Sequence, residues 1–158
     1  MWLDREPTDD EIWTAFEGEV KVSDREAVWC GFGEPTIRLD TVLGLTKRIK
    51  QSYPDLKVRL DTDGLANLRN PDRNMAEELS RAGLDYVSIS LNADTQEKYE
   101  QLCRPSLAGS YQGILDFARA CRKHISKVRL TIVNLEGIDV NKCREIAEDL
   151  SCDFEVRG

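Results

Sequence analysis

The sequence contains a single histidine, His124, in 158 residues. Any mechanism that needs two histidines is therefore excluded, including the zinc site of the HExxH motif. A Ser-His-Asp triad would have to depend on this one residue. The sequence thus argues against most hydrolase chemistries.

Long apolar runs are also absent. No stretch approaches the roughly 18 to 20 consecutive apolar residues that a membrane-spanning helix needs. The first 20 residues contain three Asp and four Glu, where a secretory signal would be basic and then apolar. We therefore expect a cytoplasmic protein with no membrane partner.

Positive charge is in the minority, because 22 Lys and Arg stand against 29 Asp and Glu, a net charge of -7. Binding to nucleic acid depends on clustered Lys and Arg that neutralise phosphates. A nucleic-acid partner is therefore disfavoured.

The cysteines are few, scattered and never spaced as CxxC. In a cytosolic protein, such cysteines are most often small, buried apolar side chains, and they form no metal motif on their own. The five are Cys30, Cys103, Cys121, Cys143 and Cys152.

What the sequence does contain is an alternation of strand and helix patterns. Runs rich in β-branched and aromatic residues predict strands at 27–32, 57–61, 86–91, 128–133 and 154–156. Apolar residues at three- and four-residue steps predict helices at 39–53, 70–83, 114–121 and 140–150, and Asp94 with Glu97 is an N-cap pattern for another. Repeated strand-helix-strand units with no hairpin signal indicate an α/β fold with a parallel sheet.

The two ends of the sequence differ from this repeat. Thr8 and Glu11 form a capping-box pattern, so the chain begins on a helix, and 154–158 read as a strand with no helix after it. A parallel strand needs cover on both faces. We therefore expect residues 1–158 to be one core domain that is truncated at its N-terminus.

In a parallel sheet, ligands bind where the strands end. The first such edge reads GFGEPT at 31–36. Gly31 and Gly33 let the backbone approach a ligand, whereas Glu34 would repel a phosphate and suits an ammonium group. The alternative is a plain strand-to-helix turn with Pro35 near its first helical position.

The next two edges are polar. LDTDG at 60–64 places two carboxylates and a hydroxyl at a strand end, and in the third strand Ser88, Ser90 and Asn92 share one face. Buried unpaired hydroxyls and amides are costly, so a polar lumen favours a ligand. The alternative is a solvated mouth or side chains that satisfy one another. Arg129 could face the same mouth or the outer face.

These three motifs together resemble the radical S-adenosylmethionine superfamily and, more narrowly, the radical enzymes associated with TatD-type nucleases. The resemblance covers essentially the whole chain. It implies a partial (β/α)6 barrel, similar to a TIM barrel, with parallel strands.

The resemblance also implies cofactors and a reaction. A [4Fe-4S] cluster would chelate S-adenosylmethionine through one iron, and its reduction, by a donor such as flavodoxin or ferredoxin, would cleave the sulfonium. The products would be methionine and a 5′-deoxyadenosyl radical, which abstracts hydrogen from a substrate. The sequence identifies neither that substrate nor a catalytic residue.

Matching positions suggest cofactor-binding residues. Gly33 and Glu34 lie where the family's motif meets the methionine ammonium, although Phe32 replaces a glycine. By the same resemblance, Ser90 and Asn92 would touch the ribose or the carboxylate. Asp61 and Thr62 would lie beside the cofactor carboxylate, although Asp63 replaces the family's Asn.

One departure affects activity directly. The family holds its cluster with a CxxxCxxC loop after the first barrel strand, and this sequence has no such spacing. Without thiolate ligands there is no cluster. We therefore predict a radical enzyme core that lacks its first strand and cluster loop, has no metal-binding residues of its own and is inactive alone.

Two other interpretations stay open at this point. One is a cluster-free module that uses the same mouth to bind S-adenosylmethionine, a nucleotide or a protein. The other is a flavodoxin-like domain whose glycine loop is incidental.

Overall fold

A parallel β-sheet organises the computed structural model, which describes residues 5–31 and 33–158. Its strands are β1 (Glu26–Trp29), β2 (Lys57–Thr62), β3 (Tyr86–Ser90), β4 (Lys127–Val133) and β5 (Asp153–Arg157). They lie in the order β1-β2-β3-β4-β5, and every neighbouring pair is parallel. This order confirms the α/β prediction. It contradicts the flavodoxin-like interpretation, which requires the order 2-1-3-4-5.

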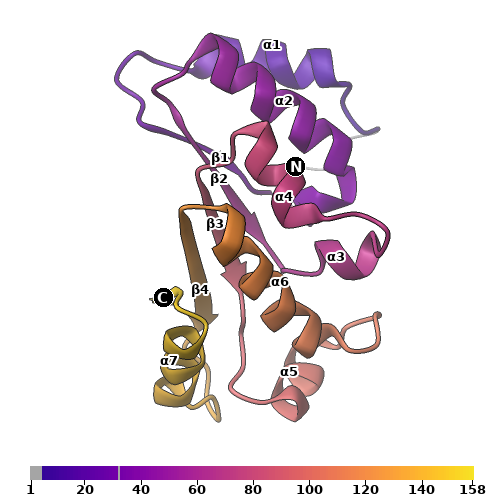
Figure 1. The fold of residues 1–158 in the computed structure, drawn as a ribbon, viewed down its shortest axis with the longest axis vertical. Helices are drawn as coiled ribbons and strands as arrows, with labels where there is room; N and C mark the ends of the chain where they lie inside the picture. Colours follow the sequence, from indigo (N-terminus) through magenta and orange to yellow (C-terminus); the bar gives the residue numbers. More distant parts are fainter. Residues whose placement is uncertain (1–4, 32) are drawn as a thin grey trace.

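Helices fill the connections between the strands. They are α1 (Asp9–Glu19), the 3-10 helix η1 (Pro35–Arg38), α2 (Leu39–Ser52), α3 (Ala66–Arg69), α4 (Met75–Ala82), α5 (Gln96–Cys103), α6 (Ser110–His124) and α7 (Val140–Asp149). Figure 1 shows α2, α4 and α6 following one another along one side of the sheet, with α1 beside α2 and α7 beside the C-terminal end. Among the described residues, no helix combines the length and the apolar character that crossing a membrane requires.

The side of the sheet that faces these helices is apolar. Val58, Leu60, Val87, Ile89 and Leu130 are fully buried there. Burying a side chain of this size contributes roughly 1.5–3 kcal/mol, so this layer supplies much of the folding free energy.

The opposite side of the sheet, called the inner face here, is polar. Side chains alternate between the two faces of a strand, and the strand register aligns these positions across the sheet. The inner-face positions include Glu26, Arg59, Asp61, Tyr86, Ser88, Ser90, Arg129, Thr131, Glu155 and Arg157. A polar inner face is what the alternation in the third strand predicts.

The N-terminal helix is fixed by its cap and by aromatic contacts. The predicted capping box is confirmed: the Glu11 amide donates to Thr8 Oγ1, and Glu11 Oε2 accepts from the Thr8 amide. The Trp13 ring packs 5.6 Å from Phe16 and 6.4 Å from Tyr53, centroid to centroid. This cluster holds α1 against the end of α2.

The first strand is shorter than predicted. The sequence predicts 27–32, but β1 ends at Trp29, and Phe32 lies outside the described residues. Cys30 and Gly31 have already left the sheet, and the backbone of Gly31 has a φ of +151°. The glycine loop therefore begins at the strand end itself.

Two helix starts were also predicted wrongly. Asn74, four residues later than predicted, accepts from the Glu77 amide and begins α4. Thr95, and not Asp94, caps α5 by accepting from the Lys98 amide. The Asp94 carboxylate is buried and instead accepts from Lys98 Nζ at 2.9 Å and from the Asp139 amide at 3.1 Å. It joins the β3 loop to the start of α7.

Gly64, two residues after the end of β2, provides a test of the packing between the sheet and α6. Its φ is +78°, and a Cβ there would lie 2.7 Å from Ile89 Cγ2. Gly137 is a matched control, because its φ is +85° and a Cβ would meet open space. Gly64→Ala should lower the free energy of unfolding by about 1–3 kcal/mol more than Gly137→Ala, as measured in urea. Equal losses would contradict this packing.

Candidate functional site

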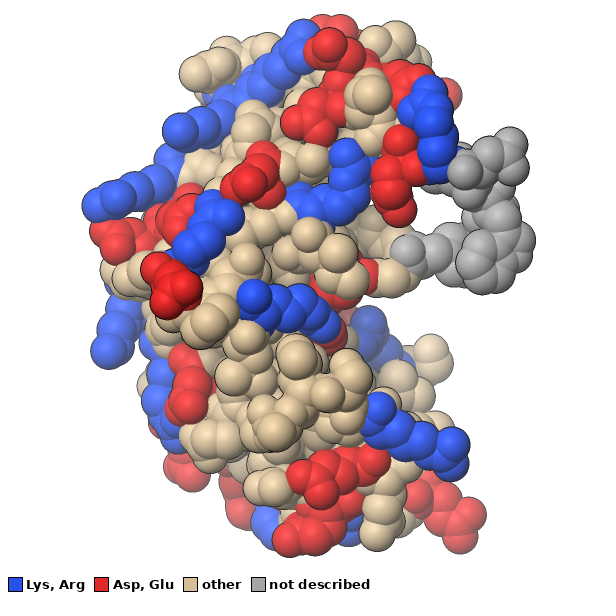
Figure 2. Space-filling model, turned by 90° about the vertical axis from the view of Figure 1, so that its right-hand side faces the viewer, with Lys and Arg blue, Asp and Glu red and all other residues tan. Residues whose placement is uncertain are grey.

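A cavity of about 590 Å³ lies at the carboxyl ends of the strands. Figure 2 shows the molecule in profile, hollowed on one side, with charged side chains of both signs near the hollow. All six residues that the sequence singled out line this cavity: Gly33, Glu34, Asp61, Thr62, Ser90 and Asn92. Cys30, Gly31, Ile37, Asp63 and Arg157 complete its lining. Parallel strands explain this convergence, because their carboxyl ends meet at one edge.

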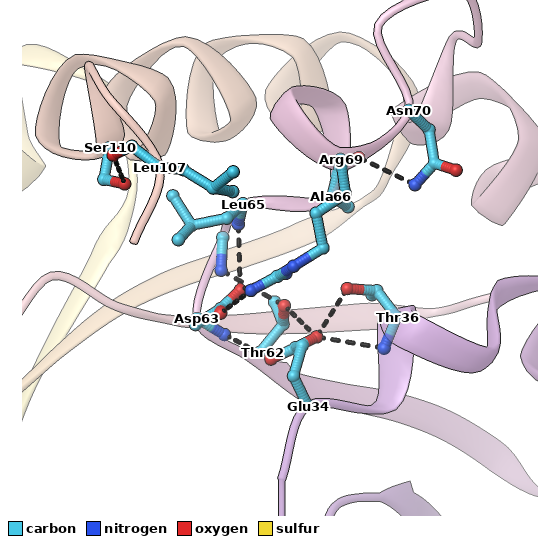
Figure 3. Close-up of polar contacts among 11 residues, drawn as sticks. Glu34, Thr36, Thr62, Asp63, Leu65, Ala66, Arg69, Asn70, Leu107 and Ser110 are labelled. Carbon is cyan, nitrogen blue, oxygen red and sulfur yellow. Dashed lines mark hydrogen bonds and ion pairs between the residues drawn. The ribbon is translucent and has the colours of Figure 1, made fainter. Parts of the chain in front are cut away.

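The Glu34 carboxylate is the best-connected group of the cavity (Figure 3). Its Oε1 accepts from the Thr36 amide at 3.0 Å and hydroxyl at 2.6 Å, and from the Thr62 hydroxyl at 2.7 Å. Its Oε2 accepts from the Asp63 amide at 2.7 Å. Glu34 thereby caps η1 and joins the loop after β1 to the end of β2.

All four of these donors are neutral, and no Lys or Arg among the described residues forms an ion pair with Glu34. Its Oε2 accepts one bond and has room for a further donor. Gly33, with a φ of +104°, places backbone without a side chain beside this carboxylate. The arrangement suits a cationic donor such as an ammonium group.

The neighbouring carboxylate, Asp63, is neutralised by an arginine. Arg69 on α3 donates to both Asp63 oxygens, to Oδ1 at 3.0 Å, and forms an ion pair with Oδ2. Asp63 Oδ1 also accepts from the Leu65 amide at 3.0 Å. The hydrogen bonds to Asp63 raise the pKa of Arg69. An Asn at position 63 could not form this ion pair, which explains what the Asp does there.

Asp61 also has a cationic partner. Its Oδ1 lies 3.5 Å from Arg59 Nε on the inner face, and the same nitrogen lies 3.3 Å from Glu26 Oε2. Arg129 also lies on the inner face but does not line the cavity. It forms an ion pair with Glu155 on the neighbouring strand β5.

The third edge brings Ser90 and Asn92 to the cavity. Asn92 has a φ of +62°, and its amide nitrogen lies 3.8 Å from Cys103 Sγ. Ser90 Oγ accepts from Arg157 Nη2 at 2.9 Å. Arg157 is not among the residues predicted from the sequence, although the alternation of Asp153, Glu155 and Arg157 in the last strand places it on the inner face.

The cysteines of this chain do not fit an iron-sulfur cluster. Cys121, Cys143 and Cys152 are buried in the core, and burial raises the pKa of Cys143 and Cys152 to about 11, so both are protonated at neutral pH. Cys30 is exposed, which contradicts the expectation that each cysteine is buried. Within residues 5–31 and 33–158, no three His, Cys, Asp or Glu side chains are grouped to hold a metal ion.

Comparison with known proteins shows a match to a protein family. A family model described as "Radical SAM superfamily" matches residues 2–150. GTP 3',8-cyclase of Lactiplantibacillus plantarum is 34% identical over 106 residues, which cover 66% of this chain and 29% of that protein. Probable GTP 3',8-cyclase of Thermococcus kodakarensis is 28% identical over 116 residues, which cover 73% and 34%. The chain thus spans about a third of the length of these relatives.

Solved structures show the same fold at low identity. A domain of pyruvate-formate lyase-activating enzyme from Bacteroides vulgatus matches with a TM-score of 0.50 and 13% identity, covering 85% of this chain and 99% of that one. The radical S-adenosylmethionine methyltransferase TsrM from Kitasatospora setae matches with a TM-score of 0.54 and 15% identity, covering 90% and 27%.

The ion pair of Asp63 and Arg69 should stabilise the cavity wall. Arg69→Met leaves a half-buried carboxylate without its cation and should lower the free energy of unfolding by about 1–3 kcal/mol at pH 7. Adding Asp63→Asn should restore part of this loss, because no unpaired charge is then left. Urea denaturation of the double-mutant cycle measures the coupling.

The exposed pair of Arg119 and Asp116 on α6 is the matched control. Arg119→Met should change stability by less than about 1 kcal/mol. Additive effects of the two changes at Asp63 and Arg69 would contradict the assigned ion pair.

Proposed function

Because the chain belongs to the radical S-adenosylmethionine superfamily, we propose that its cavity binds S-adenosylmethionine as the cofactor-binding core of a radical enzyme. One observation carries this proposal: the six residues assigned by resemblance, from three separate strand edges, line one cavity. Its volume of about 590 Å³ is in the range of small-molecule sites.

The residues present fit the cofactor's amino-acid end. Glu34 would accept from the ammonium group, and the bare backbone of Gly33 would let that group approach closely. Ser90 and Asn92 would hydrogen-bond the ribose or the carboxylate, with Asp61 and Thr62 beside them. S-adenosylmethionine, when bound, supplies the sulfonium that enzymes of this superfamily cleave.

The iron-sulfur cluster does not fit this chain. A cluster needs several thiolates around one space. The described cysteines are dispersed, and two of the buried ones are protonated. We therefore propose that this polypeptide provides the cofactor pocket and that the electron-transfer chemistry, with a flavodoxin or ferredoxin as donor, depends on cysteines outside its sequence.

The substrate is a separate question. The relatives are named GTP 3',8-cyclase, which suggests a purine nucleotide, but the match covers about a third of their length. The likeness to TatD-associated proteins stays a prediction, as does the assignment of residues 1–158 to one truncated core domain.

Glu34 gives the direct test of cofactor binding. Glu34→Ala should weaken binding of S-adenosylhomocysteine to the chain about tenfold or more, because a charge-assisted hydrogen bond is lost. Isothermal titration calorimetry measures this affinity. Glu148→Ala on the exposed side of α7 is the control and should bind as the parent does. Unchanged affinity in Glu34→Ala would refute the ammonium contact.

Iron reconstitution tests the second half of the proposal. Anaerobic incubation of the 158-residue chain with ferrous iron and sulfide should yield no stoichiometric four-iron cluster. Iron analysis and electron paramagnetic resonance provide the measurement. A stoichiometric cluster on these residues alone would overturn the assignment.

A further inference from the structure

Thr36 is a buried residue next to the cavity to which the proposed function gives no role. Its exposed fraction is 1%, and it does not line the cavity, so it cannot contact a ligand there directly. Its amide and its hydroxyl both donate to one oxygen, Glu34 Oε1, at 3.0 and 2.6 Å. Thr36 therefore acts on the cavity through the carboxylate of Glu34.

The local sequence places Thr36 for these two bonds. Glu34 precedes Pro35, and its backbone is extended, with a φ of -113° and a ψ of 116°, as a residue before proline prefers. Pro35 has a fixed φ and begins η1, which turns the next residue back toward the Glu34 side chain. The Thr36 amide is one of the first donors of that helix, which have no partner within the helix. The carboxylate two residues earlier supplies this partner.

The two oxygens of the Glu34 carboxylate are used unequally. Oε1 accepts three hydrogen bonds, because the Thr62 hydroxyl also donates to it at 2.7 Å, whereas Oε2 accepts one, from the Asp63 amide. Figure 3 shows Thr36 and Thr62 reaching Glu34 from different elements, η1 and the end of β2. The last torsion of a free glutamate side chain is broad. The three bonds to Oε1 restrict it and leave Oε2 as the oxygen with capacity for a ligand.

We propose that Thr36 is a positioning residue for an ammonium site at Glu34. Its two bonds hold the carboxylate in one orientation before the ligand arrives, which reduces the entropy lost on binding. The lengths of 2.6 and 2.7 Å from the two hydroxyls are typical of donation to an ionised carboxylate. The ammonium is that of the methionine end of S-adenosylmethionine, so the identity of the ligand rests on the proposed function.

Binding of S-adenosylhomocysteine to the full chain tests this role. Thr36→Val keeps the shape of the side chain without the hydroxyl donor and should weaken binding about tenfold. Thr36→Ser restores the hydroxyl and should bind within about threefold of the parent. In a Glu34→Ala background, Thr36→Val should have no further effect, because its partner is already absent. Isothermal titration calorimetry measures each affinity. Binding of 5′-methylthioadenosine, which lacks the ammonium group, should be the same in Thr36→Val as in the parent.

Thr46 on α2 is the matched control, because it is also 1% exposed and does not line the cavity. Its Oγ1 accepts from Trp29 Nε1 at 2.9 Å. Thr46→Val leaves that indole donor unpaired and should lower stability in urea without changing the affinity for S-adenosylhomocysteine. A merely structural role of Thr36 would give the same pattern.

A measurement without ligand separates the positioning role from the proposed function. The Asp63 amide donates to Glu34 Oε2 at 2.7 Å, so its hydrogen exchange reports on the order of the carboxylate. Exchange of this amide, followed by NMR, should accelerate about tenfold in Thr36→Val. It should stay near the parent rate in Thr36→Ser and in Thr46→Val.

Three results would overturn the positioning role. They are equal affinities of Thr36→Val and the parent, a loss of affinity that Thr36→Ser does not recover, and an unchanged exchange rate of the Asp63 amide in Thr36→Val. If the parent does not bind S-adenosylhomocysteine and the exchange rates are as expected, the cofactor proposal is wrong and the positioning of Glu34 by Thr36 stands.

Discussion

The carboxylate of Glu34 joins two loops whose contacting residues, Glu34 and Thr62, are 28 positions apart in the sequence. One side chain caps the 3-10 helix after β1 and receives donors from the end of β2. This contact fixes the glycine loop against the sheet and forms one wall of the cavity. All four donors to this carboxylate are neutral, so none of them balances its charge. The rest of the site is arranged around this group.

The two faces of the sheet differ in polarity. The face toward α2, α4 and α6 is apolar apart from the buried Thr62 and supplies much of the folding free energy, which leaves the inner face free to be polar. The charged side chains of the inner face mostly pair with one another: Arg59 pairs with Asp61 and Glu26, and Arg129 pairs with Glu155. Charges that are balanced in this way shape the groove without attracting a ligand.

The residues expected to bind the cofactor and most of the cysteines lie in different parts of the fold. The strand edges carry the elements expected of an S-adenosylmethionine pocket, and those elements converge on one cavity. The thiols instead belong mainly to the core, where burial keeps Cys143 and Cys152 protonated. A pocket of side chains at strand ends can thus form in this chain independently of the cluster that the superfamily uses beside it.

The sequence by itself determined the α/β class and the parallel sheet, which depend on local periodicity. Its resemblance to the superfamily selected the six residues that meet in the cavity, and they meet because parallel strands end at one edge. It predicted the wrong cap for α5, because Asp94 with Glu97 fits the N-cap pattern, whereas Thr95, which caps the helix, has Lys98 at that spacing. Only the tertiary structure turned Asp94 inward toward the Asp139 amide, 45 residues away.

The tertiary structure also decided which charges stay free. From the sequence, Glu34 is the expected ammonium contact, Asp63 replaces the family's Asn, and Arg157 is one of many surface cations; none of them has an assigned partner. Packing brings Arg69 onto Asp63 and places Arg157 against the hydroxyl of Ser90. The physical reason is that charge balance depends on distances between residues remote in sequence, which periodicity does not encode.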